Sequence, residues 1–76
     1  MWEAKCVPGR VEQTLAWIKR ELEPSANQAG ATAIEVFRSE DRVVVITRWS
    51  GPTDWTEPSP YPTIVERYHA WPFEPA

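Results

Sequence analysis

The chain has 76 residues and a net charge of −3, with eight basic and eleven acidic residues scattered along it. Proteins that bind nucleic acids gather Lys and Arg into a patch that neutralises phosphates, so this composition argues against a nucleic-acid partner. No stretch approaches the ~20 apolar residues that cross a bilayer, which argues against a membrane role. We expect a single domain over residues 1–76, with a core over 2–50 and a Pro- and aromatic-rich segment over 51–76.

A domain of this size buries only ~60% of the surface of its unfolded chain and often needs further support. Cys6 is the only cysteine and His69 the only histidine, so neither an internal disulfide nor a four-ligand zinc site is available. No phosphate loop or dinucleotide fingerprint occurs, so we expect no metal and no cofactor. Self-association into a homodimer remains as the support. The absence of a signal-like start and of disulfides is typical of the cytoplasm.

The spacing of apolar residues predicts a strand and then a helix at the start of the chain. Residues 2 to 7, WEAKCV, alternate apolar and polar side chains, which predicts a half-buried strand. Residues 11 to 23 then repeat apolar side chains with helical spacing, at Val11, Leu15, Ile18 and Leu22. Trp17 lies off this stripe, on a flank or a second contact surface. Pro24 is expected to stop the helix, and residues 24 to 31, PSANQAGA, to form a loop.

Two further strands are predicted over 31–38, ATAIEVFR, and 42–49, RVVVITRW. The short polar turn between them makes an antiparallel hairpin. Both faces of the second strand are largely apolar, with Val43 and Val45 on one and Val44 and Ile46 on the other. A strand of this kind is covered on both sides. One helix covers one side, and the sheet of a second subunit is the simplest cover for the other.

The chain changes character from Ser50 onward, where Pro52, Pro58, Pro60 and Pro62 predict an irregular segment. A short helix is expected over 63–70, followed by an extended arm or edge strand over 71–76. The resulting order is that of an α+β chain with a ferredoxin-like βαββα(β) subunit and an antiparallel sheet.

The stretch IEVFRSEDRVVVITRWSGPTDW, residues 34–55, resembles the antibiotic-biosynthesis monooxygenase family of dimeric α+β barrels. The resemblance covers roughly residues 2–55 and implies that two sheets pack into a shared barrel, with a pocket between sheet and helices. Such enzymes oxidise aromatic polyketides without a cofactor, degrade haem or isomerise lactones, and other members have no known chemistry. This chain has Thr47 where the family often has Glu, and 57–60, EPSP, where it often has His. Its first strand lacks the Asn of the haem-degrading members, which argues against that reaction.

The resemblance and the residue chemistry together define a candidate site. His69 is the natural general acid or base, because imidazole titrates near neutral pH; a packed or surface histidine is the alternative. Trp49 matches the family Trp that lines the pocket, or else it plugs the end of the sheet. Arg48 and Arg38 end strands, where they bind an anion or carry exposed edge charges. Cys6 is expected to be a small buried hydrophobe rather than a nucleophile.

The remaining aromatic side chains are candidates for a substrate-binding cage, or for packing the Pro-rich segment onto the sheet: Trp55, Tyr61, Tyr68, Trp71 and Phe73. Two functions follow. The first is a non-catalytic homodimer that binds a small hydrophobic molecule or a partner protein. The alternative is a cofactor-free monooxygenase or isomerase that acts on a hydrophobic, polyketide-like aromatic substrate.

Overall fold

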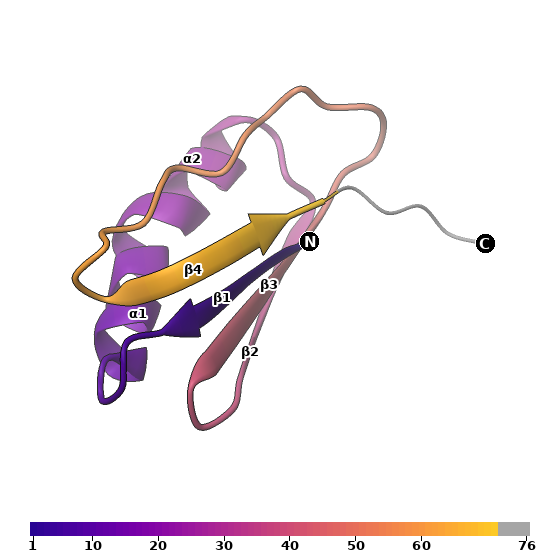
Figure 1. Cartoon of the computed structure of the whole chain (residues 1–76). Coiled ribbons are helices and arrows are strands. Elements are labelled where there is room, and N and C mark those ends of the chain that lie inside the picture. Colours follow the sequence, from indigo (N-terminus) through magenta and orange to yellow (C-terminus); the bar gives the residue numbers. More distant parts are fainter. Residues whose placement is uncertain (72–76) are drawn as a thin grey trace.

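A four-stranded antiparallel sheet carries one long helix on one of its faces (Figure 1). The computed structural model describes residues 1–71. The strands lie in the order β2-β3-β1-β4, and their bounds are Trp2–Cys6 for β1, Ala33–Arg38 for β2, Arg42–Arg48 for β3 and Val65–Ala70 for β4. The predicted first strand and the predicted hairpin are therefore confirmed, as is the α+β class.

The helix is longer than its sequence pattern indicates. It runs without a break through α1 (Val11–Trp17), a π-helical turn η1 (Ile18–Leu22) and α2 (Glu23–Gln28). The prediction that Pro24 stops the helix and that 24–31 is a loop is wrong. Proline lacks an N–H and disturbs the i→i−4 ladder, and here the ladder has already widened, because the N–H of Glu23 donates to the carbonyl of Ile18. The helix ends instead before Gly30, whose φ of 101° suits glycine alone.

The predicted short helix over 63–70 is also wrong, because Val65–Ala70 form β4. β4 pairs with β1, which places Glu3 opposite His69 and satisfies a backbone edge that β1 would otherwise leave open. Residues 49–64 cross irregularly from β3 to β4 on the helix side of the sheet (Figure 1). The sheet that residues 1–71 form in the single chain does not close into a barrel. Of the predicted extended arm, Trp71 follows β4, and 72–76 lie outside the described residues.

Two tryptophans form the centre of the core between helix and sheet. Trp2 from β1 and Trp17 from α1 are both almost fully buried, with ring centroids 5.8 Å apart. Trp17 is thus a core residue rather than a flank, as the helix turns it toward the sheet. Neither indole N–H has a hydrogen-bond partner among the described residues, and an unmet buried donor costs about 1–3 kcal/mol. Burial of the two ring surfaces outweighs that cost.

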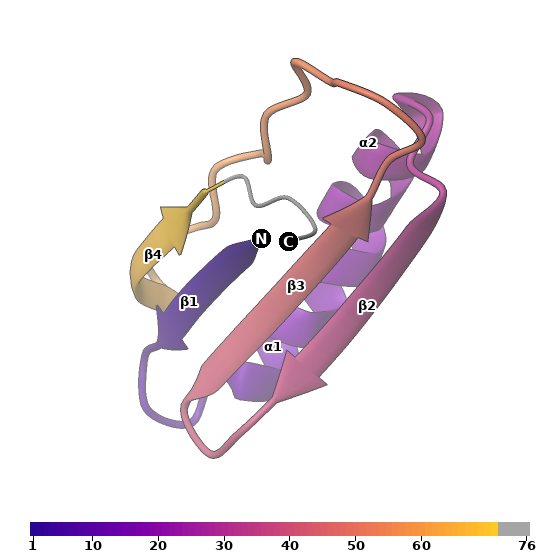
Figure 2. The ribbon, with the colours of Figure 1, turned by 90° about the vertical axis from the view of Figure 1, so that its right-hand side faces the viewer.

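The opposite face of the sheet has no layer over it in the described chain, and Figure 2 views it directly with the helix behind. The register groups Phe37, Val44 and Ile46 on this face. Phe37 is 52% exposed, while Val44 and Ile46 are half-buried. Val43 and Val45 lie in the core, so the cover predicted for one apolar face of β3 is confirmed. The cover of its other face by a second subunit stays a prediction. Residues 1–71 contain no helix with both the length and the apolar character needed to cross a membrane.

Replacing Trp17 tests the central ring pair. We expect Trp17→Ala to lower the free energy of unfolding by about 3–5 kcal/mol, because a large cavity opens beside Trp2. Trp17→Phe should lower it by only about 1–2 kcal/mol, since it keeps a ring and removes an unpaired donor. Urea denaturation at one fixed protein concentration measures both. Equal losses for the two variants would contradict this description of the core.

Candidate functional site

An open hollow of about 1110 Å³ lies at one end of the sheet. The end of β3 and the first part of the crossover, residues 47–57, form one side of it, and Met1, Ala70 and Trp71 form the other. β1 begins and β3 and β4 end at this edge. The hollow exists because the connection after β3 is an irregular segment rather than a helix packed against the sheet end.

Two of the predicted site residues form a ring pair on one side of the hollow. The rings of Trp49 and Trp55 have centroids 5.5 Å apart and are tilted by 43°. Each indole N–H is already engaged: that of Trp49 donates to Thr47 Oγ1 at 3.3 Å, and that of Trp55 donates to Ser25 Oγ at 2.9 Å. The second bond ties the crossover to α2. The rings therefore offer apolar and π surface to the hollow rather than free donors.

Further contacts fix the rest of the crossover against the helix. The hydroxyl of Tyr61 donates to Glu21 Oε2 at 2.6 Å, and this hydrogen bond raises the pKa of Tyr61 above its ordinary value. Pro60 is buried nearby. The hydroxyl of Tyr68 contacts Ser59 Oγ at 3.4 Å. These aromatic residues accordingly pack the Pro-rich segment, which is one of the two roles expected for them.

Trp71 lines the hollow from the β4 side, where its ring packs against His69 with centroids 4.8 Å apart. Its backbone N–H donates to the carbonyl of Met1 at 2.9 Å. His69 itself is exposed on the uncovered face, opposite Glu3, and does not line the hollow. The predicted base is therefore next to one tryptophan of the site but apart from the space that Trp49 borders.

Tyr68 lies on the helix side of the sheet, where its ring is 6.2 Å from that of Trp2. Arg48 lines the hollow, but its Nε donates to Glu35 Oε1 at 2.7 Å. Of the predicted residues, the structure thus brings Arg48, Trp49, Trp55 and Trp71 around one space and leaves His69 and Tyr68 outside it. Arg38 is ion-paired with Glu12, and Cys6 is buried as expected.

Two carboxylates of the hollow were not singled out from the sequence. Asp54 and Glu57 both line it, and neither has an ion-pair partner among residues 1–71. Burial lowers the pKa of the Met1 ammonium, and the charge of Glu57 partly opposes that shift. The sequence feature that could have indicated Asp54 and Glu57 is their position on either side of Trp55, in the run DWTE.

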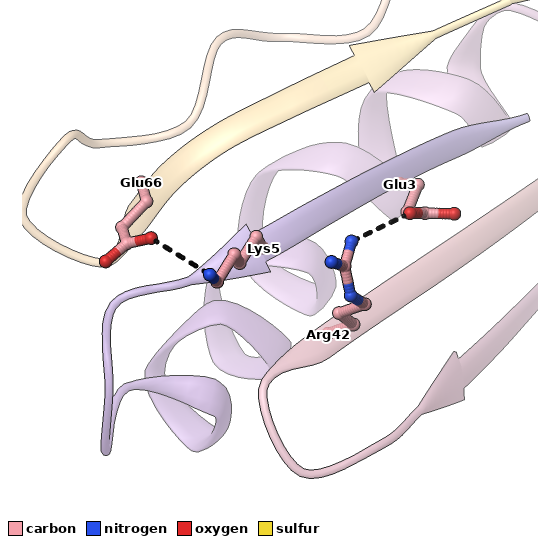
Figure 3. A network of polar contacts seen from close by, with 4 residues as sticks. All are labelled: Glu3, Lys5, Arg42 and Glu66. Carbon is pink, nitrogen blue, oxygen red and sulfur yellow. Dashed lines mark hydrogen bonds and ion pairs between the residues drawn. The ribbon is translucent and has the colours of Figure 1, made fainter.

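A second, shallow depression on the uncovered face is lined by ion-pairing side chains and by His69. Figure 3 shows Arg42 donating to Glu3 at 3.1 Å and Lys5 paired with Glu66 at 3.8 Å. All four side chains are partly exposed, and such pairs contribute little to stability. They give this side of the face a mixed charge. In the part of the chain that the structure describes, no three His, Cys, Asp or Glu side chains gather as metal ligands.

Comparison with known proteins gives no relative. No protein-family model matches the chain, and searches of curated proteins and of solved structures return no significant match.

Removing the anchor of Trp55 should loosen the crossover without unfolding the core. We expect Ser25→Ala to cost about 0.5–1.5 kcal/mol, the typical net value of one hydrogen bond. Amide hydrogen exchange over 50–57 should accelerate, while exchange in β1 and β3 stays slow. Ser59→Ala, at the other end of the crossover, is the matched control. Unchanged exchange over 50–57 in Ser25→Ala would contradict the anchoring role.

Proposed function

We propose that this protein is a homodimer that binds a small hydrophobic molecule in the hollow at the end of its sheet, and that it does so without catalysis. The observation that supports this most directly is the grouping of Trp49, Trp55 and Trp71 around one open space. These side chains come from separate parts of the chain. Trp55 is partly buried against the core, and Trp49 and Trp71 are outside the core cluster. Partly exposed tryptophans are typical of contact surfaces for ligands.

The size of the hollow and the fixed positions of two of its rings support ligand binding. Its volume of about 1110 Å³ is slightly above the range for pockets that take drug-sized molecules, about 300–1000 Å³, so a small molecule fits with space to spare. Trp49 and Trp55 are held by hydrogen bonds to Thr47 and Ser25. A ligand that stacks on them therefore meets rings that are already positioned, which reduces the ordering cost of binding.

The placement of ionisable groups favours binding over reaction. General acid–base catalysis needs a titrating group within hydrogen-bond reach of the reacting atom, and His69 lies outside the hollow. Arg48 is engaged by Glu35. Asp54 and Glu57 contribute charge there, but among residues 1–71 no nucleophile and base converge with them in the way that an active site requires.

The uncovered face of the sheet supports a homodimer. The strand order, with two crossovers of which the first is helical, fits a ferredoxin-like unit whose second helix is replaced by residues 49–64. We propose that two such sheets pack face to face, as in the dimeric α+β barrels that the sequence resembles. The apolar patch of Phe37, Val44 and Ile46 would then be buried between the subunits.

A charge placed in this patch should separate the subunits. We expect the wild-type chain to have the mass of a dimer in sedimentation equilibrium, and Ile46→Glu to be a monomer, because a buried unpaired carboxylate is costly. Ala16→Glu, on the exposed side of the helix, is the control and should remain a dimer. A wild-type monomer, or an Ile46→Glu dimer of unchanged affinity, would refute dimerisation through this face.

Binding in the hollow can be tested with a neutral naphthalene probe followed by its fluorescence. Trp55→Leu and Trp71→Leu should each weaken probe binding by about 2–10-fold, the range that corresponds to one aromatic contact. Tyr61→Phe, which keeps its ring outside the hollow, should bind as the wild type does. Aerobic incubation followed by chromatography should return the probe unchanged. Oxidised or isomerised product would favour the enzyme instead.

A further inference from the structure

β2 is the outermost strand on one side of the sheet, as Figure 2 shows. Antiparallel strands bond through every second residue, so β3 takes only half of the backbone groups of β2. The N–H of Ser39, just beyond β2, donates to the carbonyl of Arg42 at 2.9 Å. The residues that alternate with this bonded set have N–H and C=O groups that point outward: Ile34, Val36 and Arg38. No backbone hydrogen bond of residues 1–71 uses these outward groups.

The β2 edge lacks the features with which proteins block an exposed strand, namely bulges, prolines and outward charges. Its register with β3 continues without a shift over the whole strand. Both of its charged side chains are engaged: Glu35 accepts from Arg48 at 2.7 Å, and Arg38 is paired with Glu12 on α1. The opposite edge, β4, has a shift of register against β1 and an exposed cation without an ion-pair partner among residues 1–71, Arg67. The chain thus protects one edge and leaves the other open.

Apolar side chains lie along the open edge on the helix side of the sheet. Ile34 and Val36 are half-buried and pack against the core, as does Leu15 of α1. Residues that face each other in an antiparallel pair have their side chains on the same face of the sheet. A strand added to β2 would therefore place every second side chain beside these three residues. The same positions of the added strand would exchange hydrogen bonds with Ile34 and Val36, so one set of positions supplies both kinds of contact.

A second copy of β2 fits this edge poorly. A pair of β2 strands that uses all the outward groups is centred on Val36, and it places Arg38 of each copy opposite Ile34 of the other. A charge would then lie at the position where the edge offers apolar contact. Centring the pair on Glu35 instead would place two carboxylates directly opposite each other, which is destabilising. The edge therefore suits a strand of different sequence.

We propose that β2 binds an extended segment of another protein, which joins the sheet as an additional antiparallel strand. The segment has β-branched or other apolar side chains at alternate positions, and these lie beside Leu15, Ile34 and Val36. In this mode of recognition the main-chain hydrogen bonds supply affinity, and the pockets for alternate side chains supply specificity. The edge is separate from the hollow and from the uncovered face, so this inference does not depend on the function proposed above.

A short synthetic peptide, in which valine and threonine alternate between two terminal lysines, is a suitable probe. It is titrated against the isotope-labelled whole chain, and the backbone amide signals are followed by NMR. We expect shifts in Ala33–Arg38 and around Leu15, and none in Val65–Ala70. N-methylation of the valines should weaken binding at least ~10-fold, because it removes the donors that face β2. N-methylation of the threonines should change the affinity less than ~2-fold, since their N–H groups point away from β2.

A substitution in β2 assigns the effect to the edge. Val36→Pro removes an outward N–H and leaves the bonds to β3 in place, and proline is tolerated on an edge strand where its nitrogen faces solvent. This variant should bind the peptide at least ~10-fold more weakly. Val36→Thr keeps both the N–H and the branched side chain, and it should bind as the wild type does. Thermal melting shows whether each variant is folded, and the two methylated peptides decide the question if Val36→Pro is not.

Three results would overturn the proposal. The first is a lack of shifts in β2 at about 1 mM peptide, a concentration that detects weak binding, or shifts confined to β4. The second is an equal loss of affinity from the two methylated peptides, because the alternation of backbone groups would then have no role. The third is a fall in the mass of the wild-type assembly on Val36→Pro in sedimentation equilibrium, which would assign the edge to a second copy of this chain.

Discussion

The contact between one continuous helix and one face of the sheet is the interaction on which the rest of this structure depends. Trp2 and Trp17 form its centre, and their rings are large enough for a short chain to build a core from a single helix. The widened turn at Ile18–Leu22 lets the helix continue past Pro24 and so extends this cover to Ala26. Because the one helix of the described chain packs on that face of the sheet, no element of residues 1–71 covers the other face.

The connection from β3 to β4 is held in place without a second helix. Residues 49–64 have too many prolines to form one, and they are held instead by side-chain bonds to the first helix, from Trp55 to Ser25 and from Tyr61 to Glu21. These bonds draw the segment along the helix rather than across the end of the sheet. The hollow is the space that remains. Trp49 and Trp71 at its sides are not part of the core cluster, whereas Trp55 is partly buried against that cluster.

Two surfaces of the described chain remain open, the uncovered face of the sheet and the hollow at its end. The uncovered face carries an apolar patch of Phe37, Val44 and Ile46 on β2 and β3. Ion pairs lie beside the patch on all four strands, Glu35 with Arg48, Glu3 with Arg42 and Lys5 with Glu66, and an apolar patch with polar neighbours is typical of an interface. The hollow is bordered by the ring pair of Trp49 and Trp55 and by charges of both signs, with Asp54 and Glu57 opposed by Arg48 and the Met1 ammonium. The two surfaces meet at Trp71 and His69, whose rings are in contact, so a ligand in the hollow lies close to the proposed subunit boundary.

The sequence by itself determined the first strand, the hairpin, the α+β class and the two-faced character of β3, because alternation and β-branched composition act locally and are strong in these segments. It also singled out Trp49, Trp55, Trp71 and Arg48, which do line one space. Only the tertiary structure decided that Pro24 lies inside a helix and that Val65–Ala70 is a strand, since a wider turn and the open edge of β1 override local preference. It likewise separated His69 from the hollow and brought in Asp54 and Glu57. Strand register, which depends on pairing between distant residues, chooses the face on which each side chain lies.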